Sequence, residues 1–158
     1  MKMSRFKSIL TLLFLFLAGC NSRESGEYSK VHWDRDMCER CKMVLSDRKF
    51  ATQIVNPQDN RVYYFDDIGC AVLWLDEEHI KWKDKAKIWV VDIKSGEWID
   101  AKKALFSDDL ITPMAYGLGA YKKDSFPKDK KALNFEEMVK KVKEIEQIYN
   151  KKGVKVDR

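Results

Sequence analysis

The stretch RKFATQIVNPQDNRVYYFDDIGCAVLWLDEE, residues 48–78, decides the fold of this chain. Two segments rich in β-branched and aromatic residues, RKFATQIV and RVYYF, flank the turn-forming NPQDN, which predicts a hairpin with a five-residue loop. Apolar residues then recur at helical spacing over 68–75, and either Asp66 or Asp67 can cap the exposed amides of that helix. The stretch therefore predicts two paired strands followed by a largely buried helix.

The segments downstream extend this pattern. The apolar run KAKIWVVDI, ending at residue 93, predicts a buried strand beside the hairpin, so 37–93 forms a ββαβ unit with its helix across one sheet face. EWIDAKKALF, residues 97–106, is strand-like at its ends. Asn134 can cap a late helix with one apolar stripe, formed by Phe135, Met138, Val139, Val142, Ile145 and Ile148. Residues 151–158 are predicted to be a tail.

The N-terminus has the pattern of an export signal. Three basic residues precede an apolar run of about ten, half of what a permanent membrane helix needs. The run ends in LAGC at Cys20, which resembles the lipobox of bacterial lipoproteins, where the cysteine is lipidated and the chain is cut before it. We therefore expect a signal peptide over 1–19 and a lipidated flexible tether over 20–36, with the domain on the extracytoplasmic side of the cell envelope. An ordinary signal peptide preceding a cysteine is the alternative.

The charge pattern does not favour nucleic acid as a partner. Removing the signal takes away three basic residues and lowers the formal charge from +5 to +2. The remaining lysines are scattered among acidic residues, and the sequence contains no basic stripe with interleaved aromatics. We expect these charges to form an ordinary solvated surface.

Cysteine usage points to a functional site rather than a disulfide framework. With Cys20 lipidated, an odd number of thiols remains: Cys38, Cys41 and Cys70. Two of them lie in DMCERCKMVLS, residues 36–46, with a methionine two residues further on. For Cys70, in the first turn of the predicted helix, the interpretation as a small buried hydrophobe is favoured over that of an activated thiolate.

Three kinds of chemistry compete for this motif. A redox CxxC is the first, but in thioredoxin-like folds such a motif joins a strand to a helix, and the flanking residues show little of either pattern. A zinc site is the second, but zinc takes four ligands, usually in paired spacings, and only one CxxC is present. A three-cysteine site completed by a histidine, with His32 nearest in sequence, stays open.

The third chemistry, a Cu(I) site, uses more of the residues. Cu(I) prefers thiolate and thioether donors and accepts two or three of them. In an extended or irregular segment, residues two apart point the same way, so Cys41 and Met43 can face one ion. Cys38 is a further ligand or a disulfide partner of Cys41, and Met114, in TPMAYG, is the best remote candidate.

A series of motifs resembles a known family. C..C.M at 38–43 is followed by FATQI, YYFDDIGC, WVVDI, W.DA..A.F and finally TPM.YGLGAY, which ends at Tyr121. In this order they resemble the NosL family of copper-binding lipoproteins. The resemblance implies an α+β fold of two small ββαβ units packed together, with antiparallel-rich sheets and one helix each. The second, ββαβ-like unit would span 94–150.

The resemblance also implies a function. It predicts a membrane-anchored, non-catalytic Cu(I) chaperone, facing the periplasm, that delivers copper for the copper centres of nitrous oxide reductase, to the enzyme itself or to its maturation proteins. By position, Cys41 and Met43 match the family's cysteine-x-methionine motif, and Met114 matches a further ligand. Lys42 stands where the family often has glycine, so the resemblance does not establish the backbone geometry between Cys41 and Met43. A thiol-disulfide oxidoreductase using Cys38 and Cys41 is the alternative function.

Overall fold

A computed structural model describes residues 26–153. The predicted signal peptide, the lipidation site at Cys20, and the outer parts of the tether and tail lie outside these residues. The regular elements and their bounds are β1 (Thr52–Val55), β2 (Val62–Phe65), α2 (Ile68–Glu77), the short 3₁₀ helix η1 (Lys83–Lys85), β3 (Lys87–Val91), β4 (Trp98–Asp100), β5 (Leu105–Ser107), β6 (Gly119–Tyr121), the 3₁₀ helix η2 (Lys123–Ser125) and α3 (Phe135–Lys151).

The first sheet is antiparallel and has the order β2-β1-β3-β4. The β1–β2 hairpin pairs Thr52 with Phe65, and on its other side Thr52 faces Val90 of β3. These pairings confirm the hairpin and the neighbouring strand expected from the sequence. β4 extends the same sheet by pairing with β3, through Val91 and Trp98.

The second sheet consists of β5 and β6, which pair antiparallel with Phe106 opposite Ala120. The two sheets meet where Asp92, just after β3, forms an isolated parallel bridge with Ala120 of β6. A fold of α+β class, with two antiparallel sheets and two α-helices within residues 26–153, is thereby confirmed. The predicted division of the chain at residues 93 and 94 stays a prediction, and β4 lies beyond it.

Both helices begin at side-chain caps. The Asp67 carboxylate accepts the Gly69 amide at the start of α2. Asn134 and Glu137 form a reciprocal capping box at the start of α3, as the sequence pattern predicted for Asn134. Each cap satisfies amides that would otherwise lack a partner and so fixes where the helix starts.

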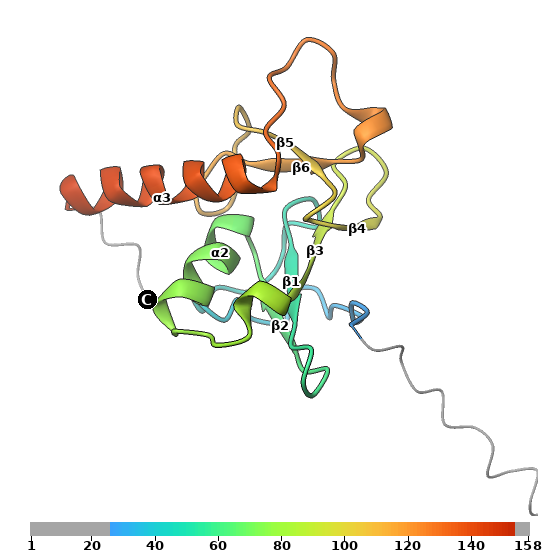
Figure 1. The fold of residues 1–158 in the computed structure, drawn as a ribbon, viewed down its shortest axis with the longest axis vertical. Helices are drawn as coiled ribbons and strands as arrows, with labels where there is room; N and C mark the ends of the chain where they lie inside the picture. Colours follow the sequence, from blue (N-terminus) through green and yellow to red (C-terminus); the bar gives the residue numbers. More distant parts are fainter. Residues whose placement is uncertain (1–25, 154–158) are drawn as a thin grey trace, which may run out of the picture.

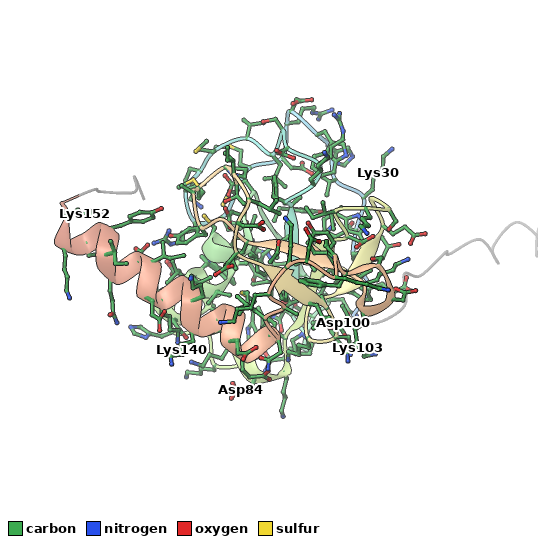
Figure 2. The ribbon with its side chains drawn as sticks, turned by 90° about the horizontal axis from the view of Figure 1, so that it is seen from above. Lys30, Asp84, Asp100, Lys103, Lys140 and Lys152 are labelled. Atoms are coloured by element: carbon green, nitrogen blue, oxygen red, sulfur yellow. The ribbon has the colours of Figure 1, made fainter. Side chains whose placement is uncertain are left out.

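The helix α2 occupies the centre of the molecule (Figure 1), where it packs against β1 and β2 on one side and against α3 on the other. Eight consecutive residues from Ile68 to Leu75 are buried, as a helix covered on most sides requires. By contrast, α3 buries only a narrow stripe that includes Met138 and Val142, and Figure 2 shows it along one side of the molecule with Lys140 toward solvent. Among the described residues, no helix is long and apolar enough to cross a membrane.

Candidate metal centre

The CxxC motif lies in a tight turn ahead of β1. The Cys38 amide donates to the Met43 carbonyl at 2.8 Å, and the Lys42 amide donates back to the Cys38 carbonyl at 3.1 Å. Lys42 has a φ of 59°, in the left-handed region that side chains rarely adopt. The position between Cys41 and Met43 therefore has the backbone conformation that glycine takes up without strain.

This turn is fastened to the strand that leads into α2. The Glu39 amide donates to the Tyr64 carbonyl of β2 at 2.9 Å. Because the chain passes directly from β2 through Asp66 into α2, the contact places both cysteines of the turn beside the start of the helix. In that first helical turn stands Cys70, fully buried.

Four side chains converge at this point. The thiols of Cys38, Cys41 and Cys70 and a carboxylate oxygen of Asp66 all lie within 4.8 Å of one another, and all four residues are buried. The Cys41 Sγ is 3.4 Å from Asp66 Oδ2, and all three cysteines are free thiols. We call these four residues the thiol cluster.

The environment shifts the protonation of the thiol cluster unequally. Hydrogen bonds from the Cys38 and Cys70 thiols lower the pKa of Cys41 to about 4. Hydrogen bonds with Cys38 and Cys41, together with burial, raise the pKa of Cys70 far above the usual range. Burial raises the pKa of Asp66 to about 7. Cys41 is thus the cluster's thiolate, and a thiolate is the form that binds metal.

A second buried carboxylate fixes the loop that carries Met114. Asp67 is fully buried, and its Oδ2 accepts the Thr112 hydroxyl at 2.5 Å and the Met114 amide at 3.3 Å. Burial raises the pKa of Asp67, although the hydrogen bonds from Thr112 and the Gly69 amide act against that shift. The Met114 backbone is therefore tied to the residue next to Asp66.

The residues predicted as ligands from the sequence have different surroundings. Cys38 and Cys41 belong to the thiol cluster. The Met43 side chain is 48% exposed, and Met114 is half-buried against the apolar core. Their roles as ligands stay predictions. His32 is exposed and lies against Asp36, with Nδ1 3.4 Å from the carboxylate.

Sequence reasoning did not select two members of the thiol cluster, Cys70 and Asp66. Cys70 is buried, as the favoured interpretation expected, but it is buried against two other thiols. Asp66 was one of two possible caps, and Asp67 takes that role. The motif DDIGC did contain the signal, since it places a carboxylate and a thiol four residues apart at a helix start.

The thiol cluster has the donors of a metal site. Thiolates are soft ligands that Cu(I) prefers, and two or three are enough to hold it. Three thiolates and one carboxylate also make up the four donors that tetrahedral Zn²⁺ accepts. The donor that the fold places beside the three thiols is therefore the Asp66 carboxylate and not the histidine considered from the sequence.

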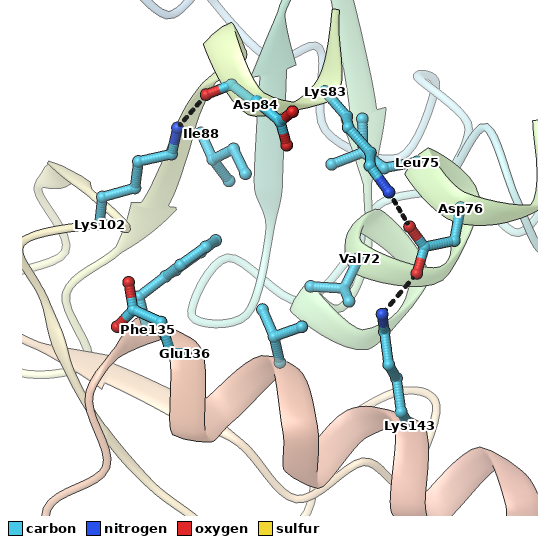
Figure 3. A pocket seen from close by; sticks show the side chains of 11 residues that line it. Val72, Leu75, Asp76, Lys83, Asp84, Ile88, Lys102, Phe135, Glu136 and Lys143 are labelled. Carbon is cyan, nitrogen blue, oxygen red and sulfur yellow. Dashed lines mark hydrogen bonds and ion pairs between the residues drawn. The ribbon is translucent and has the colours of Figure 1, made fainter. Parts of the chain in front are cut away.

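A separate cavity of about 390 Å³ lies between α2 and α3. Its floor is apolar and includes Val72 and Phe135, and at its rim Asp76 pairs with Lys83 at 3.0 Å and with Lys143 at 2.7 Å (Figure 3). None of its lining residues belongs to the thiol cluster.

Comparisons with known proteins support the fold. No protein-family model matches the sequence, and a search of curated proteins gave no match. The structure is similar to a crystal structure of the copper chaperone NosL from Shewanella denitrificans, with a TM-score of 0.55 and 17% sequence identity. The match covers 70% of this chain and 94% of that chain. It confirms, at the level of the fold, the resemblance that the motifs indicated.

Proposed function

We propose that this protein is a lipid-anchored Cu(I) metallochaperone of the cell envelope. The observation that carries the proposal is the convergence of three free thiols, from a turn and from the start of α2, within 4.8 Å. The similarity in fold to a copper chaperone supports the same function. Cu(I) is then the cargo of the protein, and no chemical transformation is required of it.

The arrangement suits a carrier because its donors differ in accessibility. Cys38 and Cys70 are fully buried, Cys41 is 8% exposed, and Met43, two residues on, is 48% exposed. Buried thiolates exclude water and hold the ion, whereas an exposed thioether is weakly bound and easily displaced. An acceptor's ligand can therefore enter from the Met43 side and take the ion by exchange.

The membrane and the acceptor complete the proposal. Lipidation at Cys20 would hold the domain at the outer face of a membrane, and the acceptor would be nitrous oxide reductase or its maturation proteins. Two measurements test these parts: mass spectrometry of the mature N-terminus for an acylated Cys20, and reactivation of copper-free nitrous oxide reductase by the Cu(I)-loaded protein.

Metal binding itself is tested by anaerobic Cu(I) titration against a chromogenic chelator, followed by X-ray absorption of the loaded protein. We expect one tightly bound ion with a shell of sulfur. Cys41→Ser should abolish tight binding, and Met43→Leu and Met114→Leu should each weaken it. A shell chiefly of nitrogen and oxygen, or no uptake, would contradict the proposal. A parallel Zn²⁺ titration separates soft-metal preference from binding of any thiophilic ion.

The thiol-disulfide oxidoreductase is the rival function. In the structure the CxxC occupies a turn, not the start of a helix that would activate its first cysteine. Catalytic reduction of a disulfide substrate by the purified protein, abolished by Cys38→Ser but unaffected by Met43→Leu, would favour the rival.

A further inference from the structure

Of the two residues between the cysteines of the turn, Arg40 is almost fully buried. Only 3% of its side chain is exposed. Its Nε and Nη2 donate to both carboxylate oxygens of Glu77, at 2.9 and 3.0 Å, and Nη2 also donates to Glu146 at 2.9 Å. Its Nη1 donates to the Tyr116 hydroxyl at 3.2 Å. The Arg40 guanidinium therefore makes four hydrogen bonds, to three different side chains.

These partners come from three different parts of the fold. Glu77 ends α2, Glu146 stands on α3, and Tyr116 lies in the loop that also carries Met114. The Tyr116 hydroxyl donates in turn to Glu146 at 2.7 Å, which closes the network. Arg40 therefore joins the metal-binding turn to both helices and to the loop of the remote methionine.

The ring of Tyr116 reaches this network by packing on the start of α2. A Cβ added to Gly69 would lie 2.1 Å from the ring, so the absence of a side chain at Gly69 lets the ring lie there. The same ring packs against Tyr149 of α3, with centroids 6.1 Å apart. The Tyr116 ring thus packs against both the start of α2 and α3, next to the Arg40 side chain.

We propose that Arg40 is a positioning residue of the metal site and that Glu146, which belongs to no candidate ligand set, sets the metal affinity through it. The inference rests on the proposed function. Arg40 directly precedes Cys41 and follows Cys38 by two residues, so anchoring its guanidinium restricts the backbone that carries both thiols. A turn that is already ordered loses less conformational entropy when it binds an ion, and therefore binds it more tightly.

A network that served stability alone would behave differently. Removing a partner of a buried arginine leaves its charge partly uncompensated and destabilises any fold. Loss of positioning would in addition weaken metal binding and make the cysteines of the turn more reactive. The test must therefore compare variants of the network with a control that lies outside the network and is at least as destabilising.

Three variants of the full-length chain provide this comparison. Glu146→Gln keeps the size of the side chain and removes the charge that faces Arg40, and Tyr116→Phe keeps the ring on Gly69 and removes only the hydroxyl. The control is Val142→Ala, which removes fully buried apolar packing from the same helix and whose side chain forms none of the hydrogen bonds of Arg40. Each variant is measured for melting temperature as metal-free reduced protein and for Cu(I) affinity by chelator competition.

We expect Glu146→Gln and Tyr116→Phe to weaken Cu(I) binding about tenfold or more, as loss of residues that orient metal ligands does. Val142→Ala should lower the melting temperature at least as much and leave the affinity close to wild type. Wild-type affinity in both network variants, or an equal loss in the control, would overturn the inference.

Alkylation rates of Cys38 and Cys41, measured without metal, give an independent readout if Cu(I) proves not to be the cargo. Both rates should rise in Glu146→Gln and Tyr116→Phe and stay unchanged in Val142→Ala. Unchanged rates in the network variants would reject the positioning role. Absence of Cu(I) uptake by the wild type would reject the proposed function and leave this comparison intact.

Discussion

Replacing Lys42 with glycine should stabilise the protein. Lys42 holds a φ of 59° between Cys41 and Met43, a conformation that costs an L-residue roughly 1–2 kcal/mol. Glycine removes that cost but loses more backbone entropy on folding, roughly 0.5–1 kcal/mol. The exposed ion pair of Lys42 with Glu39, at 3.3 Å, adds little. The net gain is about 0.5–1 kcal/mol, equivalent to about 2–5 °C in melting temperature.

The assay is thermal unfolding of metal-free reduced protein, followed by circular dichroism. Lys42→Ala is the matched control, because it removes the same ion pair but keeps a Cβ on the left-handed backbone. We expect the glycine variant to melt above wild type and the alanine variant to melt at or slightly below it.

If Lys42→Gly melts no higher than Lys42→Ala, the strain assigned to this position is absent. The result also bears on the resemblance described in the sequence analysis, which implies a glycine at this position. A stabilised glycine variant with unchanged Cu(I) affinity would show that lysine and glycine support the same turn, and that the lysine costs stability without moving the sulfurs.

Three further predictions follow from the thiol cluster and its surroundings. Gly69→Ala should destabilise the fold by about 1–3 kcal/mol in urea denaturation, because its Cβ would meet the Tyr116 ring at 2.1 Å; unchanged stability would mean that the ring moves freely. Alkylation at about pH 6, mapped by mass spectrometry, should modify Cys41 before Cys70, since neighbouring thiols lower the pKa of Cys41 to about 4 and raise that of Cys70; the reverse order would reject the thiolate assignment. Burial raises the pKa of Asp66 to about 7, so the folded state binds this proton more tightly than the unfolded state, and stability is lost as pH rises from about 4 to about 7. Urea midpoints of metal-free wild type should therefore fall relative to Asp66→Asn over that window, and parallel curves would contradict the shift.

The strands β1, β2 and β3 of the first sheet and both described helices could be predicted because their signals are local, whereas β4 was assigned to the second unit. The β1–β2 hairpin depends on a turn between two strands adjacent in sequence, and α2 and α3 each combine a cap with an apolar period. The second sheet has no such signal. β5 and β6 have three residues each and pair Phe106 with Ala120 across a long connection. Only the resemblance to a family indicated an arrangement for that half of the chain.

Prediction of the candidate site was limited for a related reason. The spacing C..C.M identifies two thiols and a thioether, because they are neighbours in sequence. Cys70 is fully buried, and a helical apolar period is equally compatible with a thiol that faces core carbon atoms and one that faces other thiols. The two possibilities differ only in which segment of the chain packs against that face of the helix. The sequence of the helix alone does not say which segment that is.

The two adjacent aspartates show where local reasoning ends. Asp67, with φ −148° and ψ 142°, is the last extended residue before α2, so its side chain turns back onto the Gly69 amide. Asp66 stands one residue earlier, and successive side chains of an extended segment point to opposite sides. Its carboxylate therefore faces away from the cap and meets the Cys41 thiol at 3.4 Å. That meeting requires the turn to dock on β2 through the hydrogen bond from Glu39 to Tyr64, a contact across 25 residues. The candidate metal site is thus a product of tertiary docking, and if the proposed function is correct, substitutions that weaken the docking should impair metal binding even where every candidate ligand remains.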